Sequence, residues 1–228
     1  LVPSVSGQAT CSGGTPTGGG TPTSLSSWDL DNCEACSFST GATGFPATSN
    51  SLSCLNVSTN KATVTSHSCA PGFDGTFAGA TCMASNGSTA EYSATYTPTA
   101  GNTGTLTTFT YYHLNPMNSY TESISGGCIS GPSSRGALGS YELDILVNGQ
   151  LTISRTIFIP HSDTWTLQTI DLTGIGVLNN FTSATTLTVR ITNPLDPNSE
   201  FNLLELLMKS SGNVVSRTHI MENVWDIN

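Results

Sequence analysis

Apolar and polar residues alternate along several stretches of this chain, and this two-residue period limits the possible folds more than any other feature. In EYSATYTP, residues 91–98, the apolar members Tyr92, Ala94 and Tyr96 occupy every second position. TTLTVRIT, residues 185–192, repeats the pattern with leucine, valine and isoleucine. Successive side chains of a strand point to opposite faces of a sheet, so alternation is typical of strands with one buried face. The sequence therefore predicts an all-β domain.

A β-hairpin is the best-defined unit in the sequence. In SYELDILVNGQLTISRTIFIP, residues 140–160, two alternating runs flank Asn148 and Gly149, a pair that is typical of a type I′ turn. Pro160 ends the second run, because proline has no N–H to donate to a neighbouring strand. The apolar side of the returning strand is predicted to contain Leu151, Ile153, Ile157 and Ile159.

The remaining strands and the domain limits are predicted from composition and order. Further predicted strands are WDL at 28–30, FDGTF at 73–77, TGTLTTFTYYHL at 103–114, TWTLQTIDLTG at 164–174 and FNLLELLMK at 201–209. We expect a Gly/Thr-rich arm over residues 1–25, a sandwich over 26–212 and a C-terminal strand or tail over 213–228. The predicted fold is an antiparallel two-sheet jelly-roll β-sandwich, with a cysteine-stapled, loop-rich N-terminal half and extended terminal segments.

The charge balance argues against two classes of partner. The formal net charge is −9, and the six Lys and Arg residues are scattered along the chain. Because nucleic-acid binding needs clustered cations, the sequence predicts no nucleic-acid partner. No apolar run approaches the roughly 18 residues of a membrane span, so no span is expected. The chain begins at Leu1 and is interpreted as a processed product.

Seven cysteines lie in the first 128 residues. In a chain rich in serine, threonine and glycine they predict disulfides and an oxidising, extracytoplasmic compartment. The pair Cys33-x-x-Cys36 is interpreted as a structural disulfide, because neither a βαβ setting nor a second close pair accompanies it. An odd number leaves at least one thiol free or paired with another chain. The candidate disulfide cysteines are Cys11, Cys33, Cys36, Cys54, Cys69, Cys82 and Cys128.

No catalytic pattern is evident in the sequence, and the chain is not predicted to be an enzyme. The histidines His67, His113, His161 and His219 are not accompanied by a Gly-x-Ser-x-Gly nucleophile motif, so they are interpreted as scattered surface residues. Asp144, Asp171 and Glu205 lie on predicted strands, but convergence of some carboxylates is expected by chance.

Two kinds of binding site are considered. Aromatic faces that stack on sugar rings are predicted for Tyr111, Tyr112, Tyr120 and Trp165, with core packing as the alternative for each. Tyr111 and Tyr112 are neighbours on one strand and therefore cannot both point into the core. A structural calcium is the candidate cofactor, with Asp29, Asp31 and Asp74 as ligands in loop-like contexts. No other cofactor is expected.

Several segments together resemble a known family. They are WDLDN at 28–32, AEYSATYTPTAGNTGTLTTFTYYH at 90–113, SYELDILVNG at 140–149, DTWTLQTIDLTG at 163–174, TTLTVRIT at 185–192 and FNLLELLMKSSG at 201–212. In strand order they resemble the jelly-roll modules of secreted bacterial surface proteins, which are related to carbohydrate-binding and galactose-binding-like domains. The resemblance implies an antiparallel sandwich and does not imply an activity.

The two ends of the chain suggest self-assembly. CSGGTPTGGGTPTS, residues 11–24, would be costly to order without a partner surface. The tail, residues 214–228, either packs on its own sandwich or adds a strand to a neighbour's sheet. The predicted assembly residues are Val214, Val215, Ile220, Val224, Trp225 and Ile227.

The functional interpretation of the sequence follows from these ends. The leading hypothesis is an extracellular or cell-surface structural subunit that polymerises with copies of itself into filaments through exchanged terminal β-segments. The alternative is a carbohydrate-binding, adhesive module of a secreted surface protein, with a polysaccharide as its partner.

Overall fold

The computed structural model describes residues 3–11, 22–30, 38–39, 43–65, 67–71, 79–82, 89–115, 139–159 and 162–195. Within these residues the regular structure is β, with one short 3₁₀ helix, η2 (Gly176–Leu178). The strands form two large antiparallel sheets and a small three-stranded one. No helix in the described part of the chain is long and apolar enough to cross a membrane.

The first sheet has five strands. In spatial order they are β14 (Ser162–Asp171), β11 (Thr103–Asn115), β1 (Ser4–Thr10), β2 (Thr23–Trp28) and β5 (Ala47–Ser49). Although its residues come first in the chain, β1 is the central strand and pairs with both β2 and β11.

The second sheet has seven strands. Along its main path lie β13 (Gln150–Ile159), β12 (Gly139–Val147), β15 (Thr185–Leu195), β10 (Thr89–Pro98), β7 (Ala62–Thr65) and β4 (Thr43–Phe45), while β6 (Leu55–Thr59) also pairs with β10. The small sheet is formed by β3 (Phe38–Ser39), β8 (His67–Pro71) and β9 (Gly79–Cys82).

The two large sheets enclose one core, and this confirms the predicted all-β, antiparallel two-sheet sandwich. The alternating residues are buried as expected, with Tyr96 at 0% and Val189 at 1% exposed. Each fully buried large apolar side chain stabilises the fold by about 1.5–3 kcal/mol. Fully buried members of the core from both sheets are Leu25, Trp28, Leu106 and Phe109 on one side and Leu55, Tyr96, Leu143, Ile145 and Leu187 on the other.

Most strands lie where the sequence pattern placed them. The hairpin of β12 and β13 turns at Asn148 and Gly149, whose φ angles of 51° and 78° agree with the predicted type I′ turn. Strand β2 ends at Trp28, so the predicted strand over 28–30 is shifted toward the N-terminus. The predicted strands over 73–77 and 201–209 lie outside the described residues.

The returning strand of the hairpin differs from its prediction. Leu151 is 61% exposed, and Ile153 and Ile157 are half-buried, whereas a continuous buried side was expected. The reason is position, because β13 is an edge strand of the seven-stranded sheet. The side chain of Ile159 lies outside the described residues.

The part of the predicted N-terminal arm that the structure describes belongs to the sandwich. Residues 4–10 form β1, and Val5 and Ala9 are each 1% exposed. Composition alone suggested a linker because the segment is rich in small residues. The segment nevertheless pairs with β2 and β11, and at Gly7 these neighbours leave no room for a side chain. Its own domain therefore holds the segment in place, and no neighbouring subunit is needed for this.

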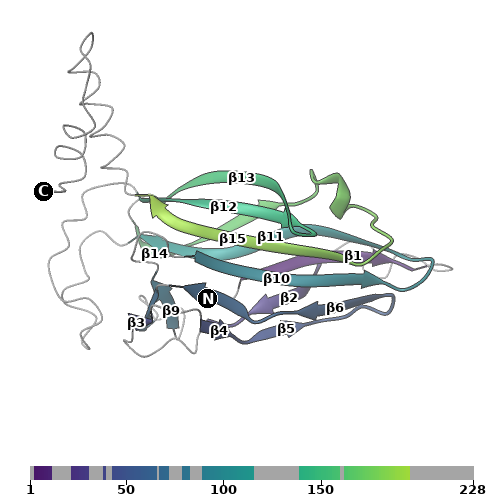
Figure 1. The fold of residues 1–228 in the computed structure, drawn as a ribbon, viewed down its shortest axis with the longest axis horizontal. Coiled ribbons are helices and arrows are strands. Elements are labelled where there is room, and N and C mark those ends of the chain that lie inside the picture. Colours follow the sequence, from purple (N-terminus) through teal and green to yellow (C-terminus); the bar gives the residue numbers. More distant parts are fainter. Residues whose placement is uncertain are drawn as a thin grey trace, which may run out of the picture.

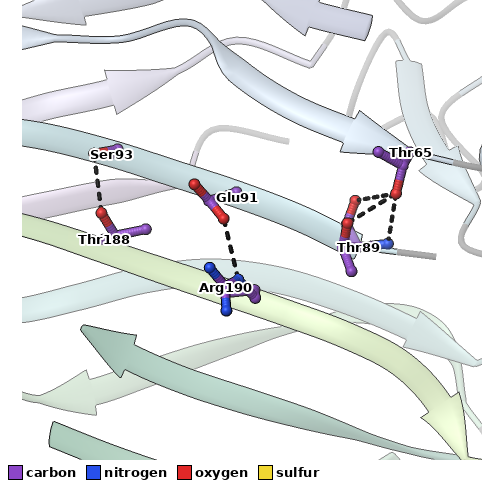
Figure 2. Close-up of polar contacts among 6 residues, drawn as sticks. All are labelled: Thr65, Thr89, Glu91, Ser93, Thr188 and Arg190. Carbon is purple, nitrogen blue, oxygen red and sulfur yellow. Dashed lines mark hydrogen bonds and ion pairs between the residues drawn. The ribbon is translucent and has the colours of Figure 1, made fainter. Parts of the chain in front are cut away.

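The outer face of the seven-stranded sheet is lined by hydroxyl groups that pair across strands (Figure 2). Ser93 and Thr188 lie 3.0 Å apart between Oγ and Oγ1, and Thr65 and Thr89 lie 2.8 Å apart between their Oγ1 atoms. Arg190 donates from Nε to Glu91 Oε2 at 3.0 Å, and both side chains are partly exposed. Each such pair contributes roughly 0.2–1 kcal/mol, so this face is stabilised by many small terms.

Gly7 is expected to be essential for the close contact of β1 with its neighbours. A Cβ at this position would lie 2.4 Å from the backbone oxygen of Thr105 and 2.8 Å from Leu25 Cδ1. We expect Gly7→Ala to lower the free energy of unfolding by about 1–3 kcal/mol, because neither neighbour can move without disturbing the core. Urea denaturation measures the loss.

Gly174→Ala is the matched control for this prediction, because a Cβ there meets nothing within 4 Å. We expect the control to unfold within about 0.5 kcal/mol of the parent protein. Equal losses in the two variants would show that crowding at β1 is not the cause.

Candidate functional site

A row of aromatic rings runs through the core and ends in a polar cluster. The ring centroids of Trp28 and Tyr92 lie 5.5 Å apart, those of Tyr92 and Phe109 5.9 Å, and those of Phe109 and Tyr111 5.5 Å. Tyr111 is 3% exposed, and its ring is followed along β11 by that of His113 at 6.3 Å. The row therefore leads from an apolar interior to hydrogen-bonding groups.

The cluster, which we call the tyrosine–histidine cluster, consists of Tyr111, His113, Tyr141 and Gln168. The phenol oxygens of Tyr111 and Tyr141 are hydrogen-bonded to each other. His113 Nδ1 lies 2.9 Å from Tyr141 Oη, and His113 Nε2 lies 3.0 Å from Gln168 Nε2. Tyr111 and His113 lie on β11, Tyr141 on β12 and Gln168 on β14, so the cluster joins the two large sheets.

The hydrogen-bond partners determine the tautomer of the imidazole. An amide nitrogen can only donate, so Gln168 donates to His113 Nε2, which must carry a lone pair. The ring proton is then on Nδ1, and His113 donates to Tyr141 Oη. The imidazole is neutral in this arrangement.

The protonation states of the cluster follow from burial. Burial raises the pKa of Tyr111 to about 12, against a smaller lowering by its hydrogen bond to Tyr141. Burial, together with the neighbouring Tyr111, also raises the pKa of Tyr141. Burial lowers the pKa of the His113 imidazole. The cluster is thus an uncharged hydrogen-bond chain at neutral pH, and it holds no activated nucleophile.

The opposite end of the sandwich is joined by different chemistry. Cys11, directly after β1, forms a disulfide with Cys54, directly before β6. Ser26 and Tyr96 form a buried hydrogen bond of 2.7 Å between their hydroxyl oxygens, also from one sheet to the other. This end carries the turn between β10 and β11, whereas β15 ends at the other end (Figure 1). One end is therefore closed covalently and the other by the tyrosine–histidine cluster.

The structure separates the aromatic residues that were predicted to stack on sugars. Tyr111 points into the core and has no exposed face. Tyr112 and Trp165 are half-buried and pack against the core. Tyr120 lies outside the described residues. Tyr111 is thus a core residue, whereas its neighbour Tyr112 is only partly buried, and the structure brings together no sugar-stacking surface from this set in the described residues.

The predicted calcium ligands are not brought together in the part of the chain that the structure describes. Asp29 is exposed at the end of β2, whereas Asp31 and Asp74 lie outside the described residues. The described residues contain no group of three or more His, Cys, Asp or Glu side chains that could hold a metal ion. The calcium site therefore stays a prediction.

The remaining predicted site residues fall mostly outside the described part. Of the seven cysteines, Cys11 and Cys54 form a disulfide. The side chains of Cys33, Cys36, Cys69, Cys82 and Cys128 lie outside it. The predicted assembly residues Val214, Val215, Ile220, Val224, Trp225 and Ile227 also lie outside it.

Sequence reasoning missed the tyrosine–histidine cluster. His113 was interpreted as a scattered surface residue, yet it is half-buried and hydrogen-bonded through both ring nitrogens. A signal was available in the alternation of the strand over 103–114, which places Phe109, Tyr111 and His113 on the same face. Gln168 gave no signal of its own, because its contact depends on the register of β14 with β11.

The fold and the cluster together define an all-β sandwich whose two sheets are joined by a disulfide at one end and by the tyrosine–histidine cluster at the other. In a comparison with known families, residues 195–228 are similar to the family described as "Transcriptional regulatory protein, C terminal". The match begins at Leu195, the last residue of β15, and its other residues lie outside the described part. No curated protein and no solved structure matches the chain.

The match contradicts the functional interpretation of the sequence. It conflicts with an extracellular structural subunit that forms filaments and with a carbohydrate-binding or adhesive module. It likewise conflicts with an extracellular or cell-surface location and with copies of the chain or a polysaccharide as partners. That interpretation rested on the Gly/Thr-rich arm, the odd cysteine count, the low content of charged residues and the apolar tail, and the tail residues 214–228 fall inside the matched segment.

The match also contradicts the prediction that the chain has no nucleic-acid partner. That prediction was drawn from a net charge summed over the whole chain and from the scatter of its cations. Within residues 195–228 the cations Lys209 and Arg217 are outnumbered by five acidic side chains, so the correction rests on the family similarity and not on local charge.

Proposed function

We propose that this chain is a regulator of transcription in which the β-sandwich carries a DNA-contacting segment, residues 195–228. The observation that carries the proposal is the similarity of these residues to the C-terminal family of transcriptional regulatory proteins. The proposal includes no reaction and no cofactor. We also propose that the sandwich has a jelly-roll fold, and we attach no function to that resemblance.

The position of β15 supports this arrangement. β15 is hydrogen-bonded on both sides, to β12 and to β10, and so lies inside the seven-stranded sheet. Its last residue, Leu195, is paired with Ser140, and Pro194 is paired with Tyr141. The segment therefore starts from a strand that the sheet holds firmly, next to the tyrosine–histidine cluster.

The charge of the chain sets the conditions under which DNA binding should be measured. A net charge of −9 opposes non-specific attraction to phosphates. Binding then depends on local cations, and the Lys and Arg residues of the segment are Lys209 and Arg217. Electrostatic contacts of this kind weaken steeply with salt, so we expect binding to be measurable at low ionic strength.

The proposal predicts a specific effect of removing these two cations. We expect the intact chain to raise the fluorescence anisotropy of a labelled duplex DNA of mixed sequence at about 50 mM salt. In the variant Lys209→Ala/Arg217→Ala, the slope of log affinity against log salt should decrease by up to about 2, because each phosphate contact contributes about 0.9.

A charge-matched variant controls for the loss of two positive charges. Lys61→Ala/Arg155→Ala removes two exposed cations of the sandwich and changes the net charge by the same amount. This control should bind DNA as the parent chain does. Absence of binding by the parent chain, or an equal loss in both variants, would overturn the proposal.

A further inference from the structure

We propose that protonation of His113 opens the end of the sandwich at which β15 leads into residues 195–228, so that the fold contains an acid-responsive switch. The inference concerns the sandwich itself and holds whether or not the chain binds DNA. It rests on the inter-sheet position of His113, on its hydrogen-bond partners and on the pairing of its neighbour Tyr141 with β15.

His113 connects elements that belong to different sheets. Its ring lies on β11 of the five-stranded sheet, and its Nδ1 donates to Tyr141 on β12 of the seven-stranded sheet. The ring centroids of His113 and Tyr141 lie 6.0 Å apart at an interplanar angle of 85°. This hydrogen bond therefore links the ends of β11 and β12, and separating these ends would hydrate the partly buried imidazole fully.

The contacts of the cluster favour the neutral ring over the charged one. A protonated imidazole carries N–H groups at both nitrogens, so its Nε2 can no longer accept from Gln168. The Gln168 amide would have to rotate and present its oxygen, or the contact would be lost. Burial of the resulting charge between two phenol rings adds a desolvation cost.

The groups that face His113 give no compensation for that charge. Among the described residues, its ring contacts are the phenols of Tyr111 and Tyr141 and the amide of Gln168, and Thr166 lies opposite in the β14 register. The phenols remain protonated at neutral and acidic pH because burial raises the pKa of each. No carboxylate takes part in these contacts within the described part of the chain.

The sign of the pH effect follows from proton linkage. Burial lowers the pKa of His113 in the closed state below its ordinary value of 6.5. An open state with a hydrated ring takes up the proton at higher pH than the closed state. The closed state is thus fully favoured above the ordinary pKa and loses stability as the pH falls toward the pKa of the closed state.

The switch is local because the two ends of the sandwich are joined differently. Tyr141 lies opposite Pro194, one residue before the segment over 195–228 begins. The far end is closed by the disulfide between Cys11 and Cys54, which does not titrate in this range. Acid should therefore loosen the cluster end first and leave the disulfide end closed.

Hydrogen exchange on the full chain, without DNA, tests the inference. Exchange is measured at about pH 7.5 and about pH 5.5 and corrected for intrinsic rates. The population of the open state should rise by up to about tenfold for each pH unit between the two pKa values. We expect this rise at the amides of Tyr111, Tyr141 and Glu142, and not at those of Ala9 and Tyr96 near the disulfide. The His113 ring signal in NMR should titrate below its ordinary pKa.

Two variants separate the switch from a general loss of stability in acid. His113→Asn has no titrating group and should remove the pH dependence at the cluster end. Gln168→Glu places a carboxylate beside the ring, so the closed state holds the imidazolium, the His113 pKa rises, and opening in acid is suppressed. Equal acid-induced exchange at both ends would overturn the inference, as would parent-like pH dependence in either variant.

Discussion

Phe109→Ala is expected to lower the free energy of unfolding by about 3–5 kcal/mol, one of the two largest effects that the structure predicts. Phe109 is fully buried, and its ring lies between those of Tyr92 and Tyr111. Alanine would remove both ring contacts and leave a cavity between two sheets that hydrogen bonds hold in place. Thermal unfolding should show a decrease in Tm of about 10 °C.

Phe158→Ala is the matched control for this substitution. Phe158 is the same residue type on the edge strand β13 and is 67% exposed. Its truncation should change the free energy of unfolding by no more than about 0.5 kcal/mol. If both variants lost the same stability, the core would not be the sandwich interior described above.

Removal of the Cys11–Cys54 disulfide is the second large effect. The bond closes a loop with a sequence separation of 43, and chain entropy predicts a loss of about 4 kcal/mol when it is broken. We expect Cys11→Ser, Cys54→Ser and the double variant to lose about the same free energy in urea denaturation. One substitution already breaks the bond, so the second should add little.

This non-additivity distinguishes the disulfide from packing at the two positions. Losses that sum in the double variant would show that each cysteine contributes separately and that the bond is not the source of the stability. The slope of the urea transition should also change, since the variant without the bond has a more expanded unfolded state.

The fold was predictable because local pattern and tertiary position agree over most strands. Tyr92, Ala94 and Tyr96 alternate in the sequence and are buried against the opposite sheet. The Asn148–Gly149 turn followed from residues that tolerate positive φ angles. Each of these segments can be predicted from its own residues, without knowledge of the neighbouring strands.

The predictions failed where the answer depends on a neighbouring strand. The segment over residues 4–10 reads as a linker from its composition, but it pairs on both sides with β2 and β11, and these neighbours require a glycine at position 7. Leu151 follows the apolar alternation and yet is exposed, because β13 happens to be an edge strand. Neither fact can be read from the segment itself.

The candidate site was harder to predict than the fold. Tyr111, His113, Tyr141 and Gln168 come from three strands, and their contacts depend on two registers and on the stacking of the sheets. Sequence reasoning identified Tyr111 as either core or exposed, and it did not connect the residue with His113. The similarity of residues 195–228 to transcriptional regulatory proteins came only from comparison with known families.

The central position of β1 has a consequence for how the chain reaches its folded state. Ser4 and Thr110 contact each other across a separation of 106 residues, so β1 must wait for a partner strand that is synthesised much later. Such distant pairings slow folding to about the millisecond-to-second range. Until β11 is synthesised, β1 has only β2 as a neighbour. The backbone N–H and C=O groups on its other edge stay unpaired and can be bound by a chaperone.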